Sequence, residues 1–141
     1  MAAPPVPLEE IRESFAFFDD WEDKYRFIID LGKSVPTLGE DARREENLVR
    51  GCQSQVWLDA AFDAQSGTFT LGIDSDAHIV RGLIAIVLAA YQGRTPNEIL
   101  AFDIEGLFDE LALLKHLSPT RGNGLRALIG RIRELARAHT A

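Results

Sequence analysis

Cys52 is the only cysteine in this chain of 141 residues, and its thiol is the strongest candidate for chemistry in the sequence. As a thiolate it would be a nucleophile, and the nearby cation Arg50 favours that form. Gly51, directly before it, permits backbone angles or a close approach that other residues do not. A lone cysteine cannot close an internal disulfide, hold a zinc ion or carry an iron–sulfur cluster by itself. Local spacing leaves two interpretations open, a small buried hydrophobic residue or a reactive nucleophile, and favours the first.

The three histidines do not form a recognisable site with Cys52. A cysteine hydrolase needs a histidine to deprotonate its thiol, but His78, His116 and His139 are scattered along the chain. None of them has the spacing of a zinc motif. We therefore expect no metal site, and a stand-alone hydrolase remains an alternative without a supporting pattern.

Two further patterns resemble ligand-binding motifs but have simpler interpretations. Asp74 and Asp76 precede an apolar helix, where such a pair is typical of capping rather than of cation binding. We expect Asp76 to be the N-cap of that helix. Residues 122–124, Gly-Asn-Gly, lack the lysine and the glycine spacing of a phosphate-binding loop. We expect them to lead into a helix.

The charge balance restricts the classes of partner, and the N-terminal sequence and hydropathy indicate the cell compartment. The chain carries 22 acidic residues against 15 lysines and arginines, a net charge of −7, which argues against nucleic acid because phosphate contacts come from Lys and Arg. The N-terminus has no signal-peptide pattern, and the longest apolar run, 83–90, is too short to cross a bilayer. We predict a single cytoplasmic domain over residues 1–141, with residues 1–7 mobile. The arginines after residue 118 are interpreted as a solvated helix face.

The elements that would position Cys52 follow from hydrophobic spacing. Residues 56–62 and 68–73 alternate apolar and polar side chains, which predicts a β-hairpin, and residues 47–49 are the candidate for a third strand. The polar residues 39–47 predict a loop with helical turns. Helices are predicted after Pro7, from Asp20 to Gly32, over 79–88, after Thr95, over 104–114 and from Ser118 onward. The fold class is therefore α+β, a small antiparallel sheet packed against several helices.

Several motifs along the chain resemble one family. Gly51-Cys52-Gln53-Ser54-Gln55-Val56-Trp57 is similar to the cysteine loop of the SufE family, which includes the CsdE branch. Three more stretches resemble the family in the same order: residues 20–32, residues 74–83 and residues 116–125. Two positions depart from it, Ile73 where many relatives have glycine and Gly122 where serine is common. Neither departure touches Cys52.

The resemblance implies a fold and a reaction. The fold would be the compact α+β domain of SufE proteins, which is similar to that of the IscU scaffolds. A SufE-like protein takes the outer sulfur of a persulfide from a cysteine desulfurase and carries it as a persulfide of its own cysteine, here Cys52. The resemblance also gives Asp76 and Arg121 a role near the cysteine loop in engaging the desulfurase. Loop residues carried over in the same way are Gly51, Gln53 and Ser54.

The same resemblance implies the partners. These are a SufS- or CsdA-like cysteine desulfurase, which the chain would stimulate, and an assembly complex of the SufBCD type, with no cofactor, nucleic acid or membrane. Whether the chain counts as an enzyme stays open, because nothing in it breaks a C–S bond without the desulfurase. The main alternative is a regulatory module that activates the desulfurase without carrying sulfur. The sequence also leaves open the SufE or CsdE branch, a homodimer as the oligomeric state, and the exposure of Cys52.

Overall fold

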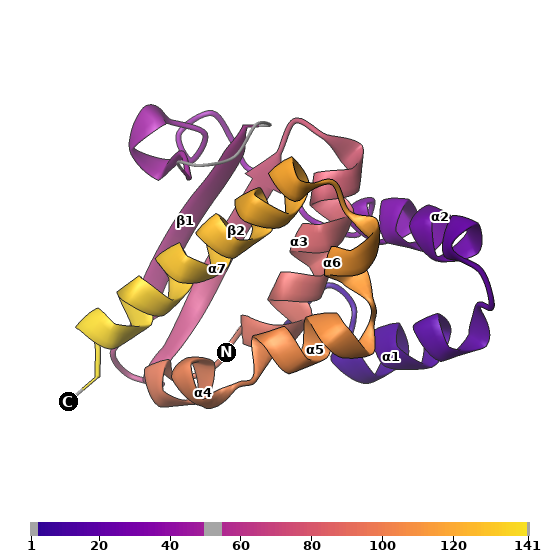
Figure 1. Cartoon of the computed structure of the whole chain (residues 1–141). Helices are drawn as coiled ribbons and strands as arrows, with labels where there is room; N and C mark the ends of the chain where they lie inside the picture. The colour runs from indigo at the N-terminus through magenta and orange to yellow at the C-terminus, as the bar shows by residue number, and fades with distance from the viewer. Residues whose placement is uncertain (1–2, 50–54, 141) are drawn as a thin grey trace.

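The computed structural model describes residues 3–49 and 55–140 of the chain. In chain order its elements are α1 (Leu8–Phe17), α2 (Trp21–Gly32), the 3-10 helix η1 (Glu45–Asn47), β1 (Val56–Asp63), β2 (Thr68–Ser75), α3 (His78–Tyr91), α4 (Pro96–Ala101), α5 (Ile104–Glu110), α6 (Leu113–His116) and α7 (Pro119–Ala138). In Figure 1 α7 lies across the small sheet, and the other helices lie to one side of it or near its lower end. The predicted α+β class is confirmed.

The sheet is the predicted antiparallel hairpin, with Val56 opposite Ser75 at one end and Phe62 opposite Phe69 near the turn. The predicted third strand at 47–49 is reduced to a single antiparallel bridge between Leu48 and Trp57. In the described part of the chain the sheet therefore has two strands. A two-stranded sheet is marginal alone, so its apolar face must be covered by helices.

Helix α3 is the central element of the core. Its residues from Leu83 to Tyr91 are all buried, as expected for a helix that is apolar nearly all round. It packs against α2 on one side and against β2 on the other (Figure 1). Helix α3 therefore links the helical half of the molecule to the sheet.

Helix α7 runs along the sheet from one end to the other. At its C-terminal end the His139 ring lies 4.5 Å from the ring of Phe62 and 5.2 Å from that of Phe69, next to the hairpin turn. A helix of 20 residues is about 30 Å long, close to the length of an eight-residue strand. The N-terminus of α7 therefore lies at the opposite end, where β1 begins and β2 ends (Figure 1).

Three helices begin where predicted, and each begins at a capping side chain. The Asp20 side chain accepts from the Asp23 N–H at 2.8 Å at the start of α2. Thr95 and Glu98 form a reciprocal capping box at α4. Ser118 accepts from the N–H of Arg121 at 3.3 Å at the start of α7. Polar side chains satisfy the free N–H groups at each of these ends.

Three local predictions were wrong. The N-cap of α3 is Ala77, without a side-chain cap, and not Asp76. The single helix predicted over 104–114 is divided into α5 and α6, because Ala112 has a left-handed backbone with φ 55°. Residues 122–124 do not form a loop before a helix but lie inside α7.

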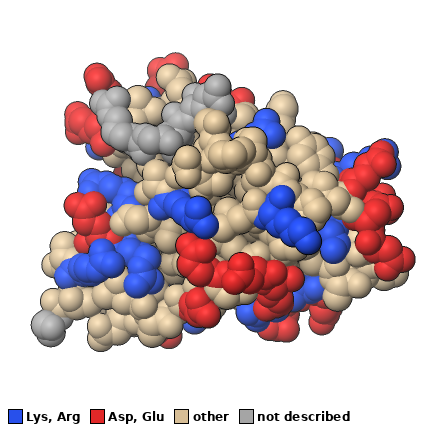
Figure 2. Space-filling view, in the orientation of Figure 1, with Lys and Arg blue, Asp and Glu red and all other residues tan. Residues whose placement is uncertain are grey.

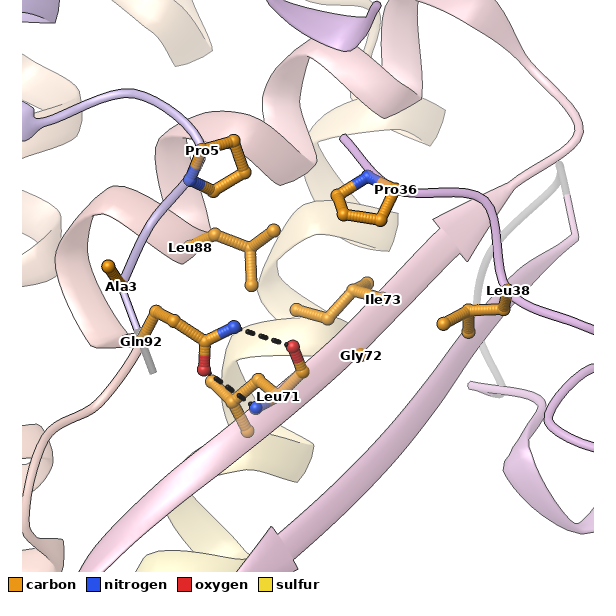
Figure 3. A pocket seen from close by; sticks show the side chains of 9 residues that line it. All are labelled: Ala3, Pro5, Pro36, Leu38, Leu71, Gly72, Ile73, Leu88 and Gln92. Atoms are coloured by element: carbon orange, nitrogen blue, oxygen red, sulfur yellow. Dashed lines mark hydrogen bonds between the residues drawn. The ribbon is translucent and has the colours of Figure 1, made fainter. Parts of the chain in front are cut away.

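The outer edge of β2 is covered by the chain that follows α3. The Gln92 side chain accepts from the Leu71 N–H at 2.7 Å and donates to its carbonyl at 2.8 Å, as a neighbouring strand would (Figure 3). The same edge borders a pocket of about 160 Å³ lined mainly by apolar groups and by Gln92. Covering an open edge in this way hinders pairing with another chain. No helix in the described residues is long and apolar enough to cross a membrane.

Candidate functional site

Asp76 is joined to the backbone of Gln55 by two hydrogen bonds. Its Oδ1 accepts from the Gln55 N–H at 3.1 Å, and its own N–H donates to the Gln55 carbonyl at 3.3 Å. Gln55 is the first described residue after Cys52. Asp76, which was predicted to cap a helix, therefore holds the chain where it returns to the sheet.

The chain before Cys52 is held at the same end of the sheet. The N–H of Val49, the last described residue on that side, donates to the Val56 carbonyl at 2.8 Å. Leu48 forms the bridge to Trp57 one residue further on. Both flanks of the cysteine segment thus meet at the start of β1. Cys52 itself, with Gly51, Gln53 and Ser54, lies outside the described residues.

A buried carboxylate, Asp74, organises the chain that leads to this point. Its side chain is fully buried. Oδ2 accepts from the Leu38 N–H at 3.0 Å and from Arg43 Nη2 at 2.7 Å and Nε at 3.2 Å. Oδ1 accepts from the Ser75 N–H at 2.8 Å and from Arg81 Nη1. A buried carboxylate needs such partners, because an unpaired charge in the interior is costly.

The two arginines on Asp74 come from different parts of the chain. Arg81 belongs to α3, is 15% exposed, and also donates from Nη2 to the Val35 carbonyl at 2.6 Å. Arg43 belongs to the polar segment before the cysteine and is 33% exposed. Its Cζ also lies 4.8 Å from the centre of the Trp57 ring, within the range of a cation–π contact. Asp74, a residue of β2, therefore ties the segment before Cys52 to α3, and Arg43 adds the contact with Trp57 of β1.

Arg121 lies in the first turn of α7, at the end of the sheet where Gln55 and Asp76 are placed. Its residue is exposed. Figure 2 shows Lys and Arg side chains gathered along α7, with acidic side chains over α5. Arg126 of α7 lies 3.8 Å from Glu105 of α5 across this boundary. The structure thus brings Asp76 and Arg121 to one end of the molecule, and within the described residues no hydrogen bond or ion pair joins the two side chains.

Two of the three histidines form ring contacts within the fold. His116 stacks on Trp21 with centroids 4.2 Å apart and planes 14° apart. His139 packs on the two phenylalanines near the hairpin turn. Within residues 3–49 and 55–140 no group of three or more His, Cys, Asp or Glu side chains is arranged to hold a metal ion.

Sequence reasoning missed Asp74 and Arg43. Asp74 was interpreted as part of a capping pair, and the segment of Arg43 as a polar loop with little to bury. No signal in the sequence indicated this burial: the alternation along β2 places Asp74 on the face opposite Leu71 and Ile73, yet its side chain is buried. A buried carboxylate requires a cation. Which of the arginines would reach it depends on how residues 36–44 fold back on the sheet, and no spacing rule gives that path.

Comparison with known proteins agrees with the motifs. Residues 9–136 match the family model for SufE, described as an Fe-S metabolism associated domain. An uncharacterised SufE-like protein of Rhizobium etli is 48% identical over 136 residues, which are 95% of this chain and 92% of that protein. Another, of Rhizobium meliloti, is 49% identical over 131 residues, 92% of this chain and 94% of that one.

The fold also matches a solved structure. The solution structure of a hypothetical protein from Thermus thermophilus superposes with a TM-score of 0.74 and covers 98% of both chains. Only 21% of the aligned residues are identical, so this likeness concerns the fold alone. The family model and the two rhizobial relatives carry the assignment: the chain belongs to the SufE family, whose domain is associated with Fe–S metabolism.

Proposed function

We propose that this protein is a sulfur carrier that receives sulfur on Cys52 from the persulfide of a cysteine desulfurase and passes it to an iron–sulfur assembly complex of the SufBCD type. Membership of a family of Fe–S metabolism supports the general role. The observation that carries the specific role is the single cysteine of the chain, placed between two flanks that hydrogen bonds of Val49 and Asp76 hold at one end of the sheet.

The reaction needs only one thiol on this protein. The Cys52 thiolate attacks the outer sulfur of the donor persulfide, a new S–S bond forms to Cys52, and the donor S–S bond breaks. The electron pair of that bond leaves with the donor cysteine, which becomes a thiolate. The proton on the outer sulfur stays on that sulfur and is transferred to Cys52 with it. No oxidant or reductant is consumed. A second thiol beside Cys52 would release the sulfur by closing a disulfide, so a single cysteine suits a carrier.

The direct test is sulfur loading. The protein is incubated with a desulfurase from the same organism and L-cysteine, without reductant, and its intact mass is measured. We expect a gain of one sulfur atom that is lost on reduction and that Cys52→Ser does not show. A wild-type mass that stays unchanged with every desulfurase the organism encodes would refute the carrier role.

The same variant separates the carrier from a regulatory module. A carrier accelerates the desulfurase by removing its persulfide, so Cys52→Ser should lose the stimulation of L-cysteine turnover. A module that acts only by binding should stimulate equally well without the thiol. Full stimulation by Cys52→Ser would therefore favour the regulatory alternative. We expect sulfur loading and stimulation of the desulfurase to take place in the cytoplasm.

A further inference from the structure

The chain that leads to Cys52 contains few apolar side chains to fix it in place. Residues 39–47 are mostly polar and exposed, apart from partly buried positions such as Arg43 and Asn47. Their local bonds are short-range, for example Arg43 N–H to the Gly39 carbonyl at 3.1 Å and Asn47 Nδ2 to the Ala42 carbonyl at 2.8 Å. A segment with so few buried contacts opens easily unless polar bonds tie it to the core.

Arg43 makes two side-chain hydrogen bonds that tie this segment to the sheet. Two of its nitrogens bind one oxygen of the buried Asp74, at 2.7 Å and 3.2 Å. Its guanidinium group also faces the ring of Trp57, which is 7% exposed. Asp74 and Trp57 are paired opposite each other in the sheet. The Arg43 side chain therefore bridges β1 at Trp57 and β2 at Asp74.

Arg43 is not required to neutralise Asp74. Arg81 already binds the other carboxylate oxygen and is the more deeply buried of the two cations. Two backbone N–H groups complete the partners of this carboxylate. Arg43 is therefore not the only counter-charge of Asp74. Its bonds also connect the segment before Cys52 to the sheet.

The connection lies next to the attachment points of the cysteine segment. Leu48 bridges to Trp57, and the Val49 N–H donates to the Val56 carbonyl. Asp76, two residues beyond Asp74, holds Gln55 on the other side. The segment that contains η1 lies against the end of the sheet where β1 begins (Figure 1). Arg43 thus holds the incoming flank, the chain before Cys52 that ends at Val49, as Asp76 holds the chain after Cys52 at Gln55.

We propose that Arg43 is a positioning residue for sulfur transfer, which clamps the chain leading to Cys52 onto Asp74 and Trp57. This inference rests on the proposed function. Attack on a persulfide held by another protein requires the two sulfur atoms to meet in line, and small misplacements of a reacting group reduce rates strongly. The contacts of Arg43 with Asp74 and Trp57 would support that alignment, although Arg43 does not touch the reacting sulfur atoms.

The chain offers a matched control for the test. Arg44 is the next residue, its side chain is 57% exposed, and its ion-pair partner is Glu46 at 3.9 Å. Arg44→Gln removes the same charge from the same segment without touching Asp74 or Trp57. Arg43→Lys keeps the charge but cannot place two nitrogens on one oxygen or lay a flat group on the ring.

Sulfur transfer is measured as the initial rate of persulfide formation on Cys52 over a range of desulfurase concentrations. We expect Arg43→Gln to lower the rate at saturation by about tenfold while the half-saturating concentration changes by less than about threefold. Arg43→Lys should recover part of the rate, and Arg44→Gln should match the wild type. A thermal melt by circular dichroism shows whether each variant is folded at the assay temperature.

Three results would overturn the proposal. They are a saturated rate for folded Arg43→Gln within about twofold of the wild type, an equal loss in Arg44→Gln, or a loss confined to the half-saturating concentration, which would make Arg43 a partner contact instead. If Arg43→Gln is unfolded, Arg43→Lys takes its place, and a saturated rate for Arg43→Lys equal to those of the wild type and Arg44→Gln overturns the proposal.

A second readout does not depend on the desulfurase. Hydrogen exchange of the Val49 amide reports directly on the incoming flank. Arg43→Gln should exchange this amide faster than both the wild type and Arg44→Gln. If wild-type protein takes up no sulfur, the proposed function fails, and exchange alone decides the clamp: faster exchange in Arg43→Gln supports it, and equal exchange in both variants refutes it.

Discussion

The side chain of Asp76 holds the backbone of Gln55 from the opposite strand end, with its Oδ1 accepting from the Gln55 N–H at 3.1 Å and its own N–H donating back at 3.3 Å. A carboxylate at this position therefore acts on the chain beside the cysteine and not on the following helix, whose N-cap is Ala77. The same residue that sequence reasoning assigned to helix capping determines where the cysteine segment rejoins the sheet.

Replacing Asp76 should release that flank. Asp76→Ala removes the acceptor, so we expect the Gln55 amide to exchange faster and the free energy of unfolding to fall by about 1 kcal/mol. Asp76→Asn keeps a carbonyl oxygen in the same place and should restore most of the protection. Both effects are measured by amide exchange in NMR spectra and by urea unfolding. Unchanged protection of Gln55 in Asp76→Ala would contradict the assignment.

Helices α2 and α3 cross at a point where only glycine fits. A Cβ on Gly82 would overlap the carbonyl oxygen and carbonyl carbon of Ile28, and one on Gly32 would lie 2.9 Å from the Gly82 nitrogen. Because these neighbours are backbone atoms, the helices would have to move apart. We expect Gly82→Ala to lower the free energy of unfolding by about 3 kcal/mol, the upper part of the range for overpacking. Urea unfolding within about 0.5 kcal/mol of the wild type would refute this close contact.

Gly130 should behave in the opposite way. It lies in the interior of α7, it is exposed, and apart from its chain neighbours and the adjacent backbone of its own helix no described atom lies within 4 Å of the position a Cβ would take. Alanine fits there and reduces the entropy lost on folding. We therefore expect Gly130→Ala to raise the free energy of unfolding by about 0.5–1 kcal/mol. This variant is the matched control for Gly82→Ala, and a loss of stability of similar size in both would show that helix geometry rather than contact decides.

Local patterns predicted most of the elements, because their causes lie within a few residues. The helices predicted from Asp20, after Thr95 and from Ser118 begin there, since an N-cap acts on N–H groups two or three residues away. The hairpin also follows from alternation along β1 and β2. The break at Ala112 was missed, because alanine gives no sign of a left-handed backbone.

The site was less predictable because its bonds join distant segments. Arg43 and Asp74 are 31 residues apart, and Gln55 and Asp76 are 21 apart. Such pairs depend on how the chain folds back, which the spacing of side chains does not encode. The resemblance to the family motifs predicted roles for Cys52, Asp76 and Arg121, yet it gave no reason why the side chain at position 76 is a hydrogen-bond acceptor. The hydrogen bond that Oδ1 of Asp76 accepts from the Gln55 N–H supplies that reason.

The buried hydroxyl of Tyr91 makes stability sensitive to alkaline pH. Tyr91 is fully buried, and its hydroxyl has no hydrogen-bond partner among the described residues. Burial raises the pKa of Tyr91 above its ordinary value. The nearby Arg133 side chain opposes the shift, first through its polar interaction with the hydroxyl and then through its charge, although no hydrogen bond of good geometry joins the two groups. Arg133 Nη1 itself donates to the Ile99 carbonyl at 3.3 Å. The folded state therefore favours the neutral phenol.

The sign of the pH effect follows from this raised pKa. Below the unfolded pKa of about 10 both states bind the proton, so the stability is complete. Above it the unfolded chain ionises first, and stability falls as the pH rises through the higher folded pKa. We expect Tyr91→Phe to lose this dependence, because no phenol remains to ionise. At neutral pH its free energy of unfolding should stay within about 1 kcal/mol of the wild type or exceed it, since the hydroxyl is unpaired.

Two measurements check the Tyr91 prediction. Ultraviolet titration of tyrosinate in the folded protein should show a late ionisation that Tyr91→Phe removes and Tyr25→Phe, the only other tyrosine replacement the chain allows, retains. Urea unfolding at neutral and alkaline pH should show a decline in stability that is smaller in Tyr91→Phe than in the wild type. The prediction is refuted if the late ionisation persists in Tyr91→Phe. It is also refuted if the free energy of unfolding falls equally with pH in Tyr91→Phe and in the wild type, because stability would then depend on pH without the Tyr91 phenol.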